Sequence, residues 1–100
     1  MIMDKDRIIA TLIENRVELE RQGVLHAALF GSMARGDATA QSDIDIMIDL
    51  DPAHGMGVFE YVGLKDYISG LFDIPVDVVN REGLYPYVKP AATADAIYAF

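Results

Sequence analysis

The segment SDIDIMIDL, from Ser42 to Leu50, alternates between isoleucines and mostly acidic residues. In an extended strand successive side chains point to opposite faces, whereas a helix would spread the same residues around its axis. The three isoleucines therefore share one face, and the opposite face carries Asp43, Asp45, Met47 and Asp49. This pattern predicts a β-strand that buries one face in a core and presents carboxylates on the other.

The rest of the chain alternates between helical and extended patterns. Asp4 can cap the first helix, Gly23 can end it, and Pro90 suits the first turn of a closing helix. The predicted helices cover residues 4–22, 58–71 and 91–98, with a short turn or helix at 33–41, and two further strands cover 24–30 and 76–80. This order predicts an α/β (α+β) fold, in which a small mixed sheet of about three strands is flanked by helices.

Composition indicates one folded domain over residues 1–100. The chain is 52% hydrophobic, which is too apolar for a disordered protein, and its length suits a single domain. No apolar run is long enough to span a bilayer and no signal-peptide core follows Met1, so we expect a cytoplasmic protein. The chain has no cysteine, which excludes disulfides and cysteine-based zinc sites.

The charge is strongly negative, with 16 acidic against 8 basic residues and a net charge of −8. Such a surface repels nucleic acids and anionic membranes unless bound cations or a basic patch reverse the local field. The acids are also unevenly spread, since five of them fall within fifteen residues: Asp37, Asp43, Asp45, Asp49 and Asp51. The chain is therefore not expected to bind nucleic acid or a membrane directly.

Asp43 and Asp45 lie two residues apart, so their carboxylates emerge on one face of the predicted strand, roughly 7 Å apart. Two acids at this distance repel each other, and a divalent cation relieves the repulsion. Mg²⁺ prefers such oxygen ligands, usually one or two carboxylates completed by water and substrate phosphates. The alternative is an exposed acidic face without a ligand.

Gly31 and Ser32 follow directly after the predicted strand at 24–30. Glycine lets the backbone approach another group closely, and backbone N–H groups together with the Ser32 hydroxyl can cradle a phosphate. Taken alone, the pair would be an ordinary turn. A phosphate cradle separated by ten intervening residues from an Asp-x-Asp pair is a more specific combination.

Two further charged residues extend this candidate site. Asp77 lies in the apolar strand at 76–80, and three carboxylates that converge can hold two Mg²⁺ ions. The alternative is that Asp77 faces solvent at a sheet edge. Arg35 lies between the cradle and the carboxylates, where it can either contact a phosphate or balance Asp37 at the surface.

The segment GSMARGDATAQSDIDIMIDLD resembles the signature of the DNA polymerase β-like nucleotidyltransferases, and above all their smallest members, the minimal nucleotidyltransferase (MNT) domains. The resemblance extends over LFGSMARG, SDIDIMIDLD, the helix near FEYVGLKDYISGLF and the strand IPVDVVN. It implies the nucleotidyltransferase fold, with Gly31 and Ser32 at the triphosphate and Asp43 and Asp45 as Mg²⁺ ligands. Asp77 would be the third acid, as ligand or as base for the incoming hydroxyl.

The resemblance also implies a reaction and a partner. The family reaction transfers a nucleoside monophosphate, usually AMP from ATP, with release of pyrophosphate. Many MNT domains are antitoxins paired with a HEPN-family toxin, typically a ribonuclease, which they neutralise by adding AMP to a tyrosine or by complex formation. Our leading hypothesis is a Mg²⁺-dependent protein adenylyltransferase acting on such a toxin.

Two alternatives stay open at this point. The chain could be a non-catalytic antitoxin that neutralises its toxin by stoichiometric complex formation, or it could modify a small molecule such as an antibiotic. The part of the chain with Pro86 and Pro90 matches the family least well, so the roles of Tyr85, Tyr87 and Tyr98 are not assigned by it.

Overall fold

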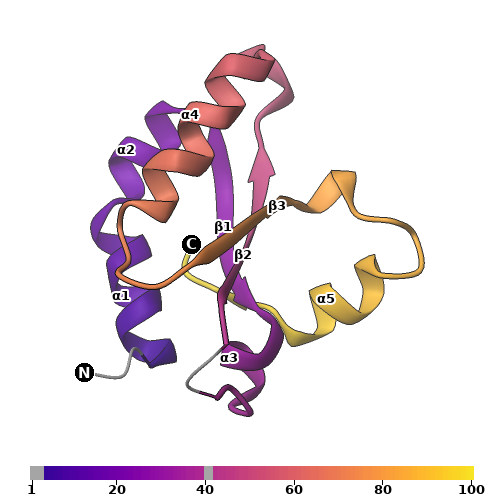
Figure 1. Cartoon of the computed structure of the whole chain (residues 1–100). Helices are drawn as coiled ribbons and strands as arrows, with labels where there is room; N and C mark the ends of the chain where they lie inside the picture. Colours follow the sequence, from indigo (N-terminus) through magenta and orange to yellow (C-terminus); the bar gives the residue numbers. More distant parts are fainter. Residues whose placement is uncertain (1–3, 40–41) are drawn as a thin grey trace.

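A four-stranded mixed sheet forms the centre of the molecule, with the strand order β3-β2-β1-β4 (Figure 1). The central strand β1 (Val24–Phe30) pairs antiparallel with β2 (Ile44–Leu50) on one side and with β4 (Ile97–Tyr98) on the other. The edge strand β3 (Val76–Asn80) runs parallel to β2. The predicted mixed sheet is therefore confirmed, with one strand more than expected.

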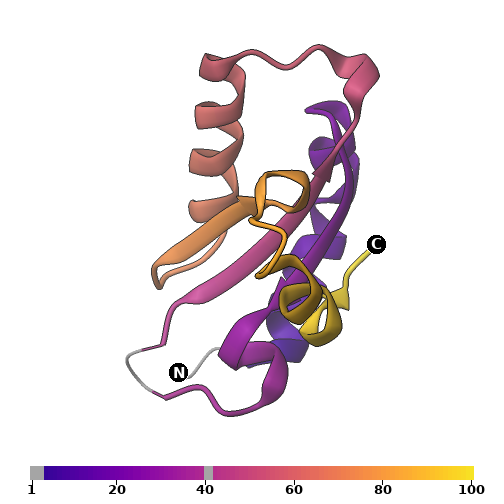
Figure 2. The same cartoon turned by 90° about the vertical axis from the view of Figure 1, so that its right-hand side faces the viewer.

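This computed structural model describes residues 4–39 and 42–100. Helices lie on both faces of the sheet (Figures 1 and 2). The helices are α1 (Lys5–Glu14), α2 (Arg16–Arg21), α3 (Gly31–Arg35), α4 (Val58–Ser69) and α5 (Lys89–Asp95), with 3₁₀ turns at Pro52–His54 and Arg81–Gly83. The predicted short segment 33–41 is thus α3, which begins and ends earlier than expected, and residues 40–41 of that segment lie outside the described residues.

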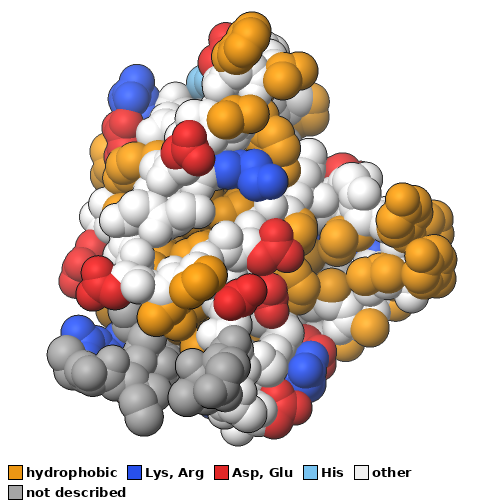
Figure 3. Space-filling model, viewed as in Figure 1, with side chains coloured by type: hydrophobic (Ala, Val, Ile, Leu, Met, Phe, Trp, Pro, Cys, Tyr) orange, Lys and Arg blue, Asp and Glu red, His pale blue; other side chains and the backbone are white. Residues whose placement is uncertain are grey.

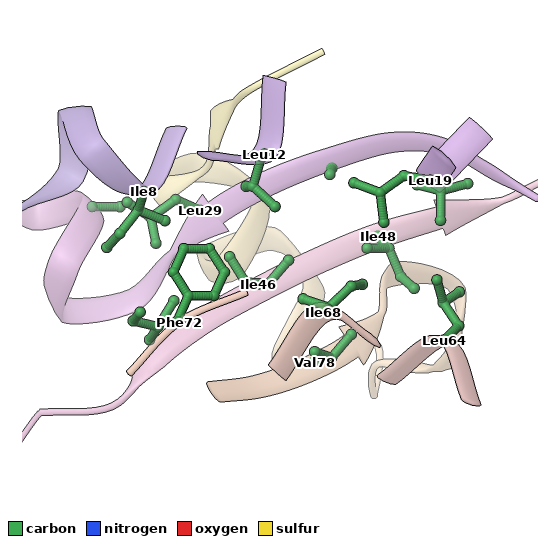
Figure 4. Close-up of a cluster of buried hydrophobic side chains, with 14 residues drawn as sticks. Ile8, Leu12, Leu19, Leu29, Ile46, Ile48, Leu64, Ile68, Phe72 and Val78 are labelled. Atoms are coloured by element: carbon green, nitrogen blue, oxygen red, sulfur yellow. The ribbon is translucent and has the colours of Figure 1, made fainter. Parts of the chain in front are cut away.

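The main core lies between the sheet and the three helices α1, α2 and α4. The isoleucines of β2 point into it, as their alternation predicts, and are fully buried. Figure 4 shows side chains of this core, which come from the helices, from the strands and, for Phe72, from the turn after α4: Ile8, Leu12, Leu19, Leu29, Ile46, Ile48, Leu64, Ile68, Phe72 and Val78. Burial of each such side chain contributes about 1.5–3 kcal/mol relative to exposure.

A smaller apolar cluster covers part of the opposite face of the sheet. Ala28 of β1, Met47 of β2 and Ala92 of α5 form it, and all three are buried. This cluster explains why Met47 stands among the aspartates of β2, since the middle of that face is covered by α5. The two ends of the same face are left to Asp45 and Asp49.

The predicted helix at 4–22 is interrupted at Asn15. Asp4 caps its start as predicted, since its side chain accepts a hydrogen bond from the backbone N–H of Arg7. Asn15 ends α1 because its side-chain amide donates to the carbonyl of Thr11, and its Oδ1 accepts from the Tyr67 hydroxyl of α4 at 3.0 Å. Asparagine competes with helical hydrogen bonds in this way, and here a distant tyrosine fixes the break.

The end of the chain also differs from the prediction of a helix over 91–98. The helix α5 ends at Asp95, and Ile97 pairs with Leu29 as part of β4. The backbone N–H of Ala99 continues this contact by donating to the carbonyl of Ala27 at 2.8 Å. This pairing satisfies the outer edge of β1, which would otherwise be an unpaired strand edge.

The parallel pairing of β2 and β3 is what positions the acidic residues. Parallel neighbours need a long crossover, and the segment with α4 supplies it. The crossover brings Ile44 opposite Val76 and Ile46 opposite Val78, both pairs facing the main core. Along the described chain, no helix combines the length and the apolar character that a membrane span requires.

Candidate active site

Asp45 and Asp77 are directly paired across the two parallel strands. Neighbouring strands are roughly 4.8 Å apart, so the two carboxylates are side by side on the face away from the main core. Asp45 is half-buried, and Asp77 is exposed on the edge strand β3. The two alternatives that the sequence left open for Asp77 therefore apply together. Asp77 lies at a sheet edge, and it also lies beside Asp45 of the Asp-x-Asp pair.

The pKa of Asp45 is raised above its ordinary value. Burial is the largest cause, followed by the negative charge of Asp77 and then that of Asp43, while Arg35 acts in the opposite direction. A charged group in a poorly hydrated position next to other carboxylates favours its protonated form. The same arrangement favours binding of a cation, which removes the repulsion.

Asp43 immediately precedes β2 and is exposed. Its charge acts on Asp45, but within the described residues no three acidic or histidine side chains lie close enough to form a ready-made metal site. Mg²⁺ commonly takes only one or two carboxylates and completes its shell with water and substrate phosphates. The arrangement of Asp43, Asp45 and Asp77 therefore suits an open site rather than a closed metal cage.

Gly31 lies against the carboxylate of Asp45. The register explains the contact, since Phe30 at the end of β1 pairs with Asp45, and the chain turns into α3 at the next residue. Gly31 has φ +74°, and a β-carbon here would overlap Oδ2 of Asp45 and lie 3.2 Å from its Cγ. Glycine is thus required for the backbone conformation and for the space that Asp45 occupies.

Ser32 lies in the first turn of α3 and is half-buried. Its backbone carbonyl accepts hydrogen bonds from the N–H groups of Gly36 and Asp37, at 3.0 and 3.1 Å, which close the short helix. Its hydroxyl forms no hydrogen bond with any residue that the structure describes. The hydroxyl is therefore free to donate to a ligand beside Gly31.

Arg35, at the end of α3, forms two ion pairs. Its Nε lies 3.1 Å from a carboxylate oxygen of Asp37, and this ion pair is one of the two alternatives that the sequence predicted for Arg35. Its Nη1 lies 2.9 Å from a carboxylate oxygen of Asp95 in α5. These contacts raise the pKa of Arg35, the bond to Asp95 being the largest cause. Asp95 is a residue that sequence reasoning missed, because no local pattern reveals a contact across 60 positions.

A hollow of about 350 Å³ opens beside Gly31, between α3 and α5. Phe30, Gly31 and Arg35 line one side of it, and the other side comes from the start of α5 and the residues before it, including Tyr87 and Ala91. Four other hollows, of about 380–650 Å³, have no lining residue among Gly31, Ser32 and Arg35. Among these five hollows, the one between α3 and α5 is lined by two residues of the candidate site, Gly31 and Arg35.

Asp49 is the second acid on this face of β2, after Asp45, and it belongs to a separate contact. It is buried, and its Oδ1 lies 2.6 Å from Nε of Arg81. An ion pair of this kind neutralises a charge that would otherwise be costly to bury. The acidic face of β2 is thus divided into an open site at Asp45 and a structural ion pair at Asp49.

The model of one protein family, described as the nucleotidyltransferase domain, matches residues 9–99. The chain belongs to this family. The predicted family and fold are thereby confirmed, and this minimal nucleotidyltransferase carries its Gly-Ser and Asp-x-Asp residues on β1–α3 and β2.

Curated relatives of this nucleotidyltransferase carry more specific names. A candidate protein adenylyltransferase of Methanocaldococcus jannaschii is 38% identical over 80 residues, which cover 79% of this chain and 80% of the relative. The protein adenylyltransferase MntA of Thermococcus cleftensis is 29% identical over 94 residues, which cover 93% of each chain.

Solved structures share the fold of this nucleotidyltransferase. A structure described as a candidate minimal nucleotidyltransferase has a TM-score of 0.70 and 30% identity, and the match covers 95% of each chain. A crystal structure described as a toxin–antitoxin with AMP-PNP has a TM-score of 0.67 and 20% identity, over 88% of this chain and 72% of that chain. At 20% identity, the similarity to the second structure shows only that the fold is shared.

Proposed function

We propose that this nucleotidyltransferase transfers AMP from ATP to a hydroxyl of a partner protein, with tyrosine as the acceptor. In this proposal the chain is the antitoxin that neutralises a HEPN-type ribonuclease toxin in the cytoplasm. The observation that carries the proposal is the pairing of Asp45 with Asp77 directly beside Gly31, in a chain whose relatives include protein adenylyltransferases.

Asp43, Asp45 and Asp77 are the residues that would hold Mg²⁺, with two ions as the expected number. Their hard oxygen donors fit this cation. The pKa of Asp45 is raised first by burial and then by repulsion from Asp77 and Asp43, and a cation relieves this repulsion. When bound, Mg²⁺ neutralises the charge of the triphosphate and lowers the pKa of a coordinated hydroxyl.

The chain's own groups would orient the nucleotide. The backbone at Gly31 can approach a phosphate closely, and the free Ser32 hydroxyl can donate to one of its oxygens. Arg35 adds a positive charge at this end of the site. This charge acts on Asp45, whose pKa it lowers against the larger effect of burial. Charge-assisted contacts to phosphates from a guanidinium are short and directional.

Asp77 suits the acceptor side of the site because it is exposed on the edge strand β3. A hydroxyl carried by another protein can reach an edge strand without entering the core. In the proposed step Asp77 accepts the proton of this hydroxyl, the hydroxyl oxygen bonds to the α-phosphorus, and pyrophosphate leaves. The net charge of −8 complements a basic partner such as an RNA-cutting toxin.

The relatives and the shared fold support a toxin as partner. One relative is named MntA, and a structure with this fold is described as a toxin–antitoxin with AMP-PNP. A second candidate function is neutralisation by complex formation without catalysis. The observation that favours it is that Asp43 and Asp77 are exposed, so both can contact a basic partner directly without a bound metal.

Co-expression with the toxin separates the two functions. We expect wild type to restore growth, and Asp45→Asn to fail although it is still produced and folded. Asp66→Asn is the matched control, since Asp66 is an exposed acid on α4, across the sheet from the site. If Asp45→Asn protects as well as wild type, neutralisation does not need catalysis and the enzymatic proposal is wrong.

A further inference from the structure

The hollow between α3 and α5 is built from segments far apart in the sequence. α3 follows β1, whereas α5 lies near the end of the chain, and the two helices lie next to each other in Figure 2. The ion pair between Arg35 and Asp95 joins them at 2.9 Å. The hollow therefore lies between two helices that an ion pair connects, and the helix on one side, α3, begins at Gly31.

The position of this hollow across the sheet separates it from the acceptor side. Phe30, Asp45 and Asp77 lie in one row across β1, β2 and β3, because Asp45 pairs with the other two residues. The hollow lies at the Phe30 end of this row, and Asp77 lies at the opposite, exposed end. In an in-line displacement the acceptor attacks phosphorus opposite the leaving group, so the departing pyrophosphate belongs on the Phe30 side, beside Gly31, if the acceptor approaches Asp77.

The lining of the hollow suits a flat, mostly apolar group. Phe30, Val88 and Ala91 contribute apolar surface, and Arg35 with Asp95 provides a polar rim. Its volume of about 350 Å³ is at the small end of the range for ligand sites. It can hold a base with part of a sugar, while the phosphates continue toward Gly31.

Tyr87 provides an aromatic wall. Its ring is stacked on that of Tyr85, with the ring centroids 5.6 Å apart and the planes 9° from parallel. Tyr87 is nevertheless 80% exposed, so the second face of its ring is open to a planar ligand. Figure 3 shows hydrophobic side chains gathered on the surface at the right, where the segment before α5 projects in Figure 1.

We infer that this hollow binds the nucleobase of the donor nucleotide and that Tyr87 stacks on it. The inference rests on the proposed function, because it places the base of the same nucleotide whose phosphates reach Gly31. It assigns a role to the end of the chain, which the family signature leaves unassigned. Stacking on an aromatic side chain tolerates every base, so this contact contributes affinity for nucleotides in general.

The test compares the binding of Mg·ATP with that of Mg-tripolyphosphate, which has the phosphates without base or sugar, by isothermal titration calorimetry. We expect Tyr87→Ala to weaken ATP binding about tenfold and to leave tripolyphosphate binding unchanged. The variant loses the stacking contact with the base but keeps every contact with the phosphates. Ala91→Phe should have the same effect by filling the hollow. Phe59→Ala is the matched control, since Phe59 is an aromatic residue on α4 that is 91% exposed.

Each other outcome overturns a defined part of the account. If both hollow variants bind ATP as wild type does, the base lies elsewhere, while the proposed transfer can still stand. If ATP and tripolyphosphate binding fall equally, the hollow holds phosphates and the inference is wrong. If wild type binds neither ligand, the proposed function fails together with the inference. Thermal unfolding of each variant confirms that it is folded.

Discussion

The carboxylate of Asp45 occupies the space in which a side chain at position 31 would lie. A β-carbon on Gly31 would overlap Oδ2 of Asp45, and the backbone of Gly31 has a positive φ of +74°. The Gly-Ser pair and the Asp-x-Asp pair, ten residues apart in the sequence, are thus in direct contact in the fold. This contact joins the candidate phosphate cradle to the candidate metal ligands.

Gly31→Ala should abolish AMP transfer, because the new methyl group displaces the Asp45 carboxylate. The left-handed backbone adds a loss of stability of about 1–2 kcal/mol. Gly55→Ala is the control, since Gly55 has φ +68° and open space around its β-carbon position. It should lose similar stability in chemical denaturation and keep full activity. Equal activity of the two variants would show that the contact with Asp45 has no role in catalysis.

Asp45→Asn should raise thermal stability at pH 7 in the absence of Mg²⁺. Because the folded-state pKa of Asp45 is raised, the folded protein binds the proton more tightly than the unfolded chain does. Stability therefore falls as the pH rises through the window between the two pKa values, and asparagine avoids this loss. Melting curves should show the advantage at pH 7 and its disappearance below about pH 4, where Asp45 is protonated in both states.

Asp49→Asn on the same strand should have the opposite effect. Asp49 forms a partly buried ion pair with Arg81 at 2.6 Å. Asparagine weakens this charge-assisted hydrogen bond and leaves the guanidinium only its longer ion pair with the exposed Glu82, at 3.6 Å. We expect a loss of about 1–3 kcal/mol in urea denaturation. An equal shift of both variants in one direction would contradict the division of this face into an open site and an ion pair.

Mg²⁺ together with ATP should stabilise the wild-type protein. A ligand at 100 times its Kd stabilises the folded state by about 2.7 kcal/mol, which raises the Tm of a domain of this size by several degrees. Asp45→Asn should lose most of this shift, and chelation with EDTA should remove it from wild type. The same shift in Asp45→Asn as in wild type would place the nucleotide away from Asp45.

Asp77→Asn should lower the rate of AMP transfer at least about 100-fold, as expected for removal of a general base or metal ligand. The side chain is exposed, so we expect the melting temperature to stay close to that of wild type. The affinity for Mg·ATP then separates the two roles, since loss of a ligand weakens binding and loss of a base does not. A transfer rate within a few-fold of wild type would exclude both roles.

The elements governed by local patterns were predictable from the sequence. The strands at 24–30 and 76–80 have the predicted bounds, because short apolar runs between turn residues have few alternatives. The break at Asn15 and the strand β4 were not predictable, since each depends on a partner from a distant element, Tyr67 for the first and β1 for the second.

The same distinction holds for the candidate site. The spacing of Asp43 and Asp45 is a local property, so it could be interpreted from the sequence alone. The position of Asp77 beside Asp45 needs the order and register of two strands joined by a long crossover. The ion pair of Arg35 with Asp95, and the hollow behind it, need the return of the chain end to the sheet, which no spacing rule predicts.

AMP transfer to a partner protein would be visible at once in the intact mass of that partner. The purified chain is incubated with its HEPN-type partner, ATP and Mg²⁺, and the partner is measured by mass spectrometry. We expect a gain of one or more AMP units with wild type and with Asp66→Asn, and none with Asp45→Asn. An unchanged partner mass, with folded wild type that binds Mg·ATP, would show that this chain does not transfer AMP to that partner.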